Sequence, residues 1–387
     1  MPYAAPDYYA LDELLTDDEK VVRDNLRRFV EAEVMPRIAS HFRAGTFPRD
    51  LPAKLGELGA LGASLEGYGC AGLGPVAYGL IMQELERADS GVRSFASVQG
   101  SLVMYPIHAY GSEAQKERWL PRMAKGVAIG CFGLTEPDFG SNPSGMRTSA
   151  RLSGDRWILN GEKRWITSGG IADVAVVWAR TDDGIRGFLV ERGTPGFTTR
   201  DIEGKFSLRA SVTSELIFQD CAVPLDAQLP GALGVKAPLS CLNQARYGIC
   251  WGVIGAAMAC YDEALRYTKE RVQFKRPIAG YQLVQLKLVD MLEEITKAQL
   301  LAWRLGRLKE AKKVRPQQVS LAKRNNVRMA LEIARNARDL LGANGVTDEY
   351  QAGRHMCNLE SVFTYEGTDH IHTLIVGEDI TGLAAFE

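Results

Sequence analysis

The stretch FTYEGTDHIH, residues 363–372, gathers side chains that could do chemistry. Its glutamate, Glu366, could act as a general base, because burial in a dry pocket raises the pKa of a carboxyl group towards neutrality. Since it stands before Gly-Thr, it could equally be an ordinary acid at the start of a helix. A metal site built from Asp369, His370 and His372 is disfavoured, because two histidines at this spacing point roughly 200° apart on a helix. The segment therefore predicts a base or a helix-start acid, and no metal.

A second set of polar residues lies in and just before the segment RSFASVQ, and comprises Glu86, Arg93, Ser94 and Ser97. Charged residues beside an apolar run such as SVQGSLVM usually form the solvated edge of a helix, which is the simplest interpretation. If the arginine were buried, a pocket for a plain hydrocarbon chain would leave its desolvation uncompensated. A buried Arg93 would therefore indicate a ligand that carries its own carboxylate.

Three further segments could hold a cofactor, although each also has an ordinary structural explanation. The loop FGLTEPDFGS offers small residues and the hydroxyls of Thr135 and Ser141 as hydrogen-bond donors, or it could be a plain turn. The run WIT at 165–167 fits a strand with one aromatic residue. Arg271, in the motif RVQF, could bind a pyrophosphate or could be a solvated helix-end residue. No GxGxxG stands between a predicted strand and a helix, so a dinucleotide would not be held in the Rossmann manner.

The composition narrows the class of protein. A chain of 387 residues can form two or three domains. With 46 Lys+Arg against 47 Asp+Glu it has no basic surplus for nucleic acid. Its seven cysteines are scattered and lack a CxxC pair, which favours a reducing compartment over a disulfide framework or structural zinc. The N-terminal stretch lacks a signal or transit pattern and no apolar run reaches membrane length, so we expect a soluble cytoplasmic protein.

The hydrophobic period predicts how the domains are ordered. Residues 1–130 are expected to form a helical domain, with a capping box at Thr16 and Glu19. In residues 131–236 the period changes to two, which predicts a small β-domain with Asn160-Gly161 as a hairpin turn. Residues 237–387 return to the helical period and suit a bundle. The predicted fold is therefore mainly α with a central β-domain.

Individual elements can be predicted within these parts. Helical patterns occupy 51–61, 75–87, 112–125, 239–271, 280–309 and 316–341. The runs ADVAVVWAR, IRGFLVER and SELIFQDCAVP are expected to be strands.

The order of the domains, together with several motifs, resembles the acyl-CoA dehydrogenase family of flavoproteins, and within it the glutaryl-CoA dehydrogenases. The motifs span nearly the whole chain in one order: RSFASVQGSLVM, CFGLTEPDFGSNPSGM, GKFSLRAS, CLNQARYGICWGV, RVQFKRPI, AKRNN and NLESVFTYEGTDHIH. The resemblance implies an N-terminal helical domain, a β-barrel domain and a C-terminal four-helix bundle. It also implies a homo-oligomer, commonly a tetramer.

The resemblance implies FAD as the cofactor, held by residues of two subunits. One subunit would contribute Phe132, Leu134, Thr135, Gly140, Ser141, Trp165, Ile166, Thr167, Thr368 and His370. Its neighbour would contribute Arg271, Phe274, Gln282, Leu341, Gly342 and Gly345. His370 and His372 depart from the EGTxxIQ pattern that is frequent in the family, which leaves the flavin contact of His370 open.

The resemblance also implies roles in catalysis. Glu366 matches the base that removes the α-proton of an acyl-CoA while a hydride leaves the β-carbon. Residues implied to contact the substrate are Glu86, Arg93, Ser94, Ser97, Ser141, Arg246 and Tyr365. The implied reaction is oxidation and decarboxylation of glutaryl-CoA to crotonyl-CoA, with electrons passed to an electron-transfer flavoprotein. The alternatives are a non-decarboxylating glutaryl-CoA dehydrogenase, a short-chain acyl-CoA dehydrogenase or oxidase, and a catalytically silent flavin-fold binding protein.

Overall fold

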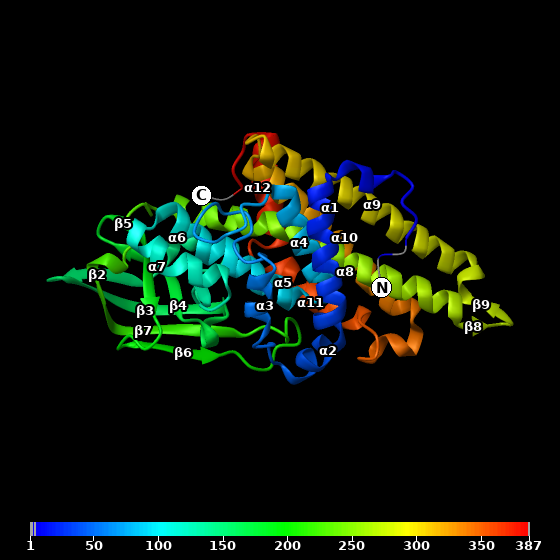
Figure 1. The fold of residues 1–387 in the computed structure, drawn as a ribbon, viewed down its shortest axis with the longest axis horizontal. Coiled ribbons are helices and arrows are strands. Elements are labelled where there is room, and N and C mark those ends of the chain that lie inside the picture. The colour runs from blue at the N-terminus through cyan, green and yellow to red at the C-terminus, as the bar shows by residue number, and fades with distance from the viewer. Residues whose placement is uncertain (1–2, 4, 386–387) are drawn as a thin grey trace.

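The protein is elongated, with a curled β-sheet at one end and long helices that extend to the other (Figure 1). The computed structural model describes residue 3 and residues 5–385. The N-terminal and C-terminal helices pack against each other, and most buried apolar side chains belong to one core that these helices share. A second, smaller core fills the inside of the sheet. The predicted order of helices, strands and helices is confirmed.

The N-terminal part is helical and begins where the sequence predicts. Thr16 caps the first long helix, because its hydroxyl accepts a hydrogen bond from Glu19 N at 3.3 Å and its backbone N–H donates to Glu19 Oε2 at 2.8 Å. The capping box is therefore confirmed. The helices of this part are η1 Leu11–Leu14, α1 Asp17–Phe29, η2 Val30–Val34, α2 Met35–Ala44, α3 Leu51–Glu57, α4 Pro75–Ala88, α5 Ser90–Ser97, η3 Val98–Met104, α6 Tyr105–Tyr110 and α7 Glu113–Ala124.

The segment from Ser90 to Met104 is more deeply buried than a solvated helix edge would be. It forms α5 and the π-helical stretch η3, and every one of its residues is buried. The interpretation of Arg93 as part of a solvated helix edge is therefore wrong. The polar residues of α5 still follow a helical period, and this pattern is the same whether other helices or solvent cover the polar face.

The β-domain is a seven-stranded sheet with the order β1-β4-β2-β3-β7-β6, in which β5 pairs with β4. Strand β4 runs parallel to β1 and β2, and the other pairs are antiparallel. The strands are β1 Gly130–Gly133, β2 Ser149–Ser153, β3 Arg156–Thr167, β4 Val174–Thr181, β5 Gly184–Glu191, β6 Phe197–Asp201 and β7 Thr213–Pro224. Three single-turn helices accompany them, η4 Pro143–Gly145, η5 Gly169–Ile171 and η6 Leu225–Ala227.

The predicted hairpin turn at Asn160-Gly161 is wrong. Strand β3 runs straight through this pair, with a bulge against β7. Gly161 has φ 142°, and a Cβ atom there would lie 2.6 Å from the Cα of Thr148, so glycine is needed for close backbone approach. The Asn160 side chain accepts from Asp220 N at 2.8 Å and so stabilises the bulge. A bulge and a turn favour the same residues, which explains the error.

The C-terminal part contains the longest helices, and the three long helical segments that the sequence predicts are confirmed. Helix α8, with 35 residues, extends about 50 Å from the sheet to the far end of the molecule. The main helices of the C-terminal part are α8 Lys236–Glu270, α9 Gln282–Glu310, α10 Pro316–Leu340, α11 Ala352–Thr364 and α12 Asp369–Thr381. Between them lie the β8 Val272–Gln273 and β9 Arg276–Pro277 hairpin and the short helices η7 Ile278–Gly280 and η8 Gly342–Val346.

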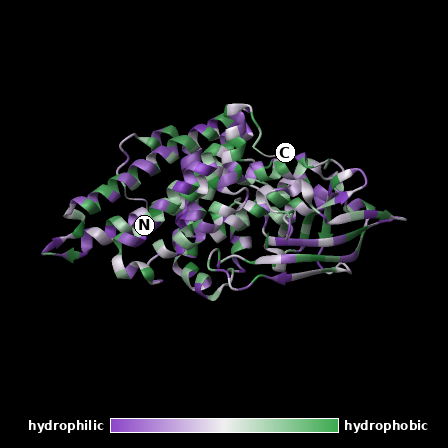
Figure 2. Ribbon diagram, turned by 180° about the vertical axis from the view of Figure 1, so that it is seen from behind, coloured by the Kyte–Doolittle hydropathy of each residue, from purple (hydrophilic) through white to green (hydrophobic). Residues whose placement is uncertain are grey.

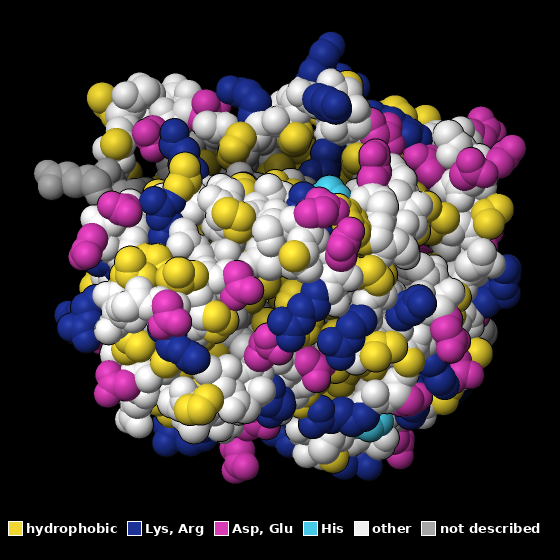
Figure 3. Space-filling view, turned by 60° about the vertical axis from the view of Figure 1, so that its left-hand side comes forward, with side chains coloured by type: hydrophobic (Ala, Val, Ile, Leu, Met, Phe, Trp, Pro, Cys, Tyr) yellow, Lys and Arg dark blue, Asp and Glu magenta, His cyan; other side chains and the backbone are white. Residues whose placement is uncertain are grey.

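The surface is mixed in character. Hydrophilic and hydrophobic residues alternate along the helices and strands (Figure 2), and no helix in the described ranges has the length and apolarity needed to cross a membrane. On the face shown in Figure 3, acidic and basic side chains are interspersed. This face therefore has no extended basic stripe of the kind that binds nucleic acid.

Candidate active site

Glu366 lies in the short linker between α11 and α12. Its backbone is left-handed, with φ 51°, and Gly367 follows with φ 89°. A residue with a Cβ atom rarely adopts this conformation, which costs about 1–3 kcal/mol and persists only where the surroundings enforce it. The turn redirects the chain between the two helices and places the glutamate inside the protein.

Two buried cations bind the backbone of this turn. Lys323 Nζ, from α10, donates to Tyr365 O and to Gly367 O, both at 2.6 Å. Arg246 Nε, from α8, donates to Glu366 O at 2.9 Å. Three consecutive carbonyl groups therefore each accept a hydrogen bond from a basic side chain.

The carboxyl group of Glu366 combines burial with a missing hydrogen-bond partner. The residue as a whole is partly exposed, but its Oε2 atom is buried and lacks a hydrogen-bond partner in the described part of the chain. Burial raises the pKa of this carboxyl group, while the charges of Arg93, Lys323 and Arg246 oppose the rise. An unpaired carboxylate of raised pKa is the kind of group that removes a proton from carbon near neutral pH.

Arg93 forms the centre of a second buried cluster. Its side chain has no exposed surface, and its Nε donates to Glu86 Oε2 at 2.6 Å, in an ion pair whose carboxylate is also fully buried. Its Nη2 donates to Glu86 Oε1 at 3.3 Å and to the hydroxyl of Tyr365. Tyr365 precedes Glu366, so the cluster adjoins the base directly.

The expectation that a buried Arg93 would be left without compensation unless a ligand supplied a carboxylate is wrong, because Glu86 already balances its charge. The hydrogen bonding of Arg93 is nevertheless incomplete. Arg93 Nη1 and, one helical turn later, Ser97 Oγ are both buried and find no partner among the described residues. A donor and a hydroxyl on the same face of α5 could therefore still receive a polar group of a ligand.

Glycines on α8 make room for this cluster. A Cβ atom at Gly252 would lie 2.1 Å from Glu86 Oε2 and 3.0 Å from Arg93 Nε. One turn earlier, a Cβ atom at Gly248 would lie 2.9 Å from the hydroxyl of Tyr78. Burial of the ion pair between α4, α5 and α8 therefore depends on glycine at position 252.

The predicted flavin-contacting residues of the β-domain differ in their exposure to solvent. Phe132, Leu134 and Ile166 are buried, whereas Thr135 and Thr167 are partly exposed and Gly140 and Ser141 lie on an exposed loop. Trp165 stands out, because it is 56% exposed, has φ 63° and lies at a bulge in β3. An aromatic face presented to solvent by a strained bulge suits stacking on a planar ring.

A buried ion pair fixes the loop beside Trp165. Lys163 Nζ donates to Glu136 Oε1 at 2.8 Å and to Leu134 O at 3.1 Å. Glu136 also accepts from the backbone of Arg147 at 2.6 Å and of Thr148 at 2.9 Å. Burial lowers the pKa of Lys163 to about 8. The loop that follows β1 is therefore rigidly held, as a cofactor-binding loop must be.

The residues predicted to bind the flavin of a neighbouring subunit lie far from the sheet. Arg271, Phe274 and Gln282 are exposed at the β8–β9 hairpin and the start of α9, at the opposite end of the molecule from the sheet (Figure 1). The turn at 341–345 adjoins this end, because Asn344 donates to the hydroxyl of Tyr267 near the end of α8. There Leu341 and Gly345 are buried and Gly342 is exposed. One subunit cannot bring both sets to one flavin.

The residues after Glu366 form the start of α12. Thr368 caps the helix by accepting from Ile371 N at 3.1 Å. His370 is exposed and His372 is fully buried, so the two rings point in different directions, as predicted for a helix. In the ranges that the structure describes, no group of three His, Cys, Asp or Glu residues is arranged to hold a metal ion.

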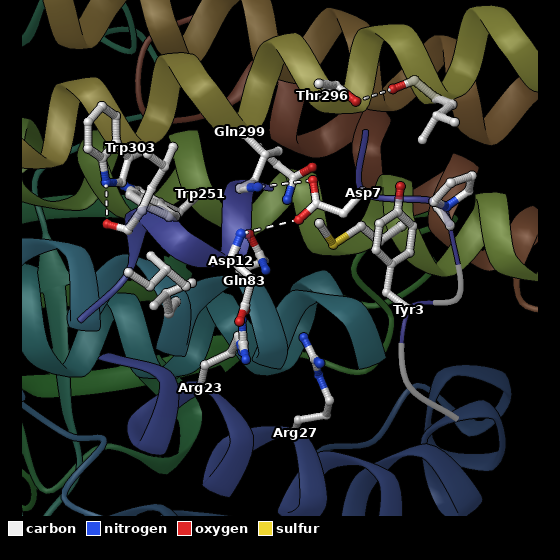
Figure 4. A pocket seen from close by; sticks show the side chains of 18 residues that line it. Tyr3, Asp7, Asp12, Arg23, Arg27, Gln83, Trp251, Thr296, Gln299 and Trp303 are labelled. Atoms are coloured by element: carbon white, nitrogen blue, oxygen red, sulfur yellow. Dashed lines mark hydrogen bonds and ion pairs between the residues drawn. The ribbon is translucent and has the colours of Figure 1, made fainter. Parts of the chain in front are cut away.

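A cavity of about 220 Å³ lies apart from this chemistry, beneath the N-terminal segment and against α4, α8 and α9 (Figure 4). Trp251 lines it, whereas the next residue, Gly252, faces Glu86 and Arg93. Since neighbouring residues of a helix point about 100° apart, the cavity lies on another side of α8 from the Arg93 cluster. It is not part of the candidate site.

The structure adds residues that sequence reasoning missed. Lys323, Glu136 and Lys163 are buried charges that hold the segments of the site, and Gly252 gives the Arg93 cluster its space. The motif AKRNN contains Lys323, and a lysine inside a helical apolar pattern was the available signal.

Known proteins resemble this chain over nearly its whole length. Family models for the acyl-CoA dehydrogenase N-terminal, middle and C-terminal domains match residues 16–127, 131–221 and 233–381. The human mitochondrial short-chain specific acyl-CoA dehydrogenase is 37% identical over 370 residues, which cover 94% of this chain and 90% of that protein.

Two solved structures of glutaryl-CoA dehydrogenase from Mycobacterium smegmatis are more similar. One, in complex with FADH2, is 56% identical, with a TM-score of 0.97 over 98% of both chains. The other is 58% identical, with a TM-score of 0.96 over 97% of both chains. These matches confirm the predicted family and fold, and the chain belongs to the acyl-CoA dehydrogenase family.

Proposed function

We propose that the protein is an FAD-dependent glutaryl-CoA dehydrogenase that also decarboxylates its product to crotonyl-CoA. The FAD supplies the hydride acceptor. Glu366 takes the α-proton of glutaryl-CoA as a hydride leaves the β-carbon, which gives glutaconyl-CoA. The C–C bond to the γ-carboxylate then breaks, carbon dioxide leaves, and the resulting dienolate takes a proton at its γ-carbon from Glu366. One carboxyl group thus serves first as base and then as acid.

The single observation that carries the substrate assignment is the pair of unpartnered buried groups at Arg93 Nη1 and Ser97 Oγ. A substrate carboxylate would accept from both, in charge-assisted hydrogen bonds. The similarity to glutaryl-CoA dehydrogenases at 56% and 58% identity supports the same substrate.

A short-chain acyl-CoA dehydrogenase is the second candidate, and one observation favours it. Glu86 neutralises Arg93 within the protein, so the pocket does not require an anionic substrate. The 37% identity to the human short-chain enzyme points the same way. The two candidates differ in one respect that can be measured, namely whether the terminal carboxylate of the substrate improves catalysis.

We further propose that FAD lies between two subunits and that the enzyme is a homo-oligomer, with an electron-transfer flavoprotein as its electron acceptor. The β8–β9 hairpin lies at the end of the molecule opposite the sheet, which supports the first point, since the hairpin could reach a flavin beside the sheet only in another subunit. Large apolar side chains near Arg271 are exposed, as at a subunit interface: Val272, Phe274, Leu283, Leu286 and Val289.

The proposal is tested by anaerobic titration of the FAD-loaded enzyme. Glutaryl-CoA should bleach the flavin absorbance of the wild type, whereas Glu366→Gln should bind FAD and glutaryl-CoA but be reduced at least about 10⁴-fold more slowly. A normal rate of reduction in Glu366→Gln would show that another group is the base. Measuring the electron-transfer flavoprotein as acceptor against oxygen separates a dehydrogenase from an oxidase.

A further inference from the structure

Lys323 is a buried cation for which the proposed chemistry has no direct use. It lies on α10 with 1% of its surface exposed, and its ammonium group contacts backbone carbonyl groups. An ammonium group placed in a protein interior without a partner carboxylate is costly, and a methionine of similar length would avoid that cost. Its presence therefore calls for a specific explanation.

The position of its two acceptors suggests the explanation. They are the carbonyl oxygens of Tyr365 and Gly367, the residues immediately before and after Glu366, and each lies 2.6 Å from Lys323 Nζ. The residue between them has a left-handed backbone. An ordinary backbone for Glu366 would rotate at least one of the two carbonyls away from the ammonium group.

We propose that Lys323 is a positioning residue for the base: its ammonium group holds the left-handed turn of residues 365–367 and so aims the Glu366 carboxylate into the substrate pocket. The inference rests on the proposed function of Glu366. Arg246 assists by binding the middle carbonyl from α8. Since the two cations come from different helices, the turn is fixed from two sides.

The same arrangement affects the charge of the base. The charged and titratable groups that interact with Glu366 or with its neighbours Lys323 and Tyr365 come from every element around them: Tyr78 and Glu86 on α4, Arg93 on α5, Arg246 and Cys250 on α8, Lys323 on α10, Tyr365 in the linker and His372 on α12. Removing the positive charge of Lys323 removes one of the three cations that favour the ionised carboxylate. The ionisation of Glu366 would then require a higher pH.

The test is the rate constant of flavin reduction by glutaryl-CoA, measured anaerobically as a function of pH. In Lys323→Met the limiting rate should fall about 10²-fold, as for a displaced catalytic group, and the acid limb of the profile should move to higher pH. The dissociation constant of glutaryl-CoA should change by less than about threefold, because Lys323 is not assigned to the substrate. Lys309→Met, which removes another lysine from the bundle, one that contacts Gln244, should retain the wild-type profile.

A purely structural lysine would give a different result. If folded, FAD-loaded Lys323→Met reduces its flavin at the wild-type rate with the wild-type acid limb, the proposal is overturned. If that variant does not fold, Lys323→Arg carries the test: it keeps the charge but moves the donors, so the rate should fall at least tenfold while the acid limb stays in place. A wild-type rate in Lys323→Arg would overturn the positioning role. Failure of the base assignment itself would appear separately, as activity in Glu366→Gln.

Discussion

The most informative perturbation removes the buried ion pair as a unit. Replacing Arg93 alone would leave Glu86, which is fully buried, without its partner, at a cost of about 3–5 kcal/mol in stability. The loss of activity in Arg93→Met would then mix a folding defect with a lost substrate contact. The double variant Glu86→Gln/Arg93→Met avoids the stranded charge, so it should remain folded and keep its flavin.

The effect on specificity can be worked out from the unpaired atoms. Nη1 is the nitrogen of Arg93 left free for the substrate, and a hydrogen bond to a charged group contributes about 1.5–3 kcal/mol. Glutaryl-CoA and pentanoyl-CoA have chains of equal length and differ in the terminal carboxylate. The ratio of their catalytic efficiencies should therefore fall about 10- to 150-fold in the double variant. Adding Ser97→Ala should lower the ratio further, because it removes the second unpaired group.

The assay is steady-state kinetics with both substrates on wild type, the double variant and the triple variant. Pentanoyl-CoA activity serves as the internal control, since the uncharged chain makes no contact with the guanidinium. If the ratio in the double variant equals that of the wild type, the unpaired Nη1 does not bind the substrate. The description as a short-chain acyl-CoA dehydrogenase would then be the better one.

Three other outcomes follow from the same structure. Arg271→Ala should lower FAD retention and weaken the oligomer together, as absorbance and light scattering would show; full occupancy in an intact oligomer would contradict its role in a neighbouring site. Gly252→Ala should lower the free energy of unfolding by about 3 kcal/mol or more, because its Cβ atom would press on the buried ion pair, whereas Gly377→Ala, with nothing within 4 Å, should not destabilise the protein in the same thermal melt. Burial lowers the pKa of His372 to about 3. Below about pH 6.5 the unfolded chain therefore binds a proton that the folded protein does not bind. The free energy of unfolding should accordingly fall as the pH is lowered from about 6.5 towards 3. His372→Gln should remove about 2 kcal/mol of that loss at pH 5, and equal denaturation curves for the two proteins at that pH would refute the assignment.

Sequence motifs predicted the fold correctly where the motif is typical of only one local structure. The capping box at Thr16 and the apolar period of the three long C-terminal helices are of this kind, since both depend only on neighbours in the sequence. The prediction at Asn160-Gly161 is wrong because a turn and a bulge make the same local demand on the backbone, and the choice depends on distant residues, Asp220 in β7 and Thr148 just before β2.

The sequence predicted only part of the candidate site, for a related reason. Helix α5 has an amphipathic pattern like that of a surface helix, so its sequence favours an exposed Arg93, whereas the surrounding helices bury it. The pairing of Glu86 with Arg93 and the bonds from Lys323 to the linker join residues of different helices, so no spacing in the sequence encodes them. Glu366 itself could be singled out because a motif surrounds it, but the turn that aims it is a tertiary feature.

The products of a single anaerobic turnover show most directly whether the protein oxidises and decarboxylates glutaryl-CoA. The FAD-loaded enzyme would be mixed with excess glutaryl-CoA, and the acyl-CoA products and carbon dioxide quantified against the flavin reduced. The expected result is one crotonyl-CoA and one carbon dioxide for each flavin reduced. Accumulation of glutaconyl-CoA without carbon dioxide would contradict the decarboxylation, and a flavin that stays oxidised with glutaryl-CoA but is reduced by butyryl-CoA would contradict the substrate assignment.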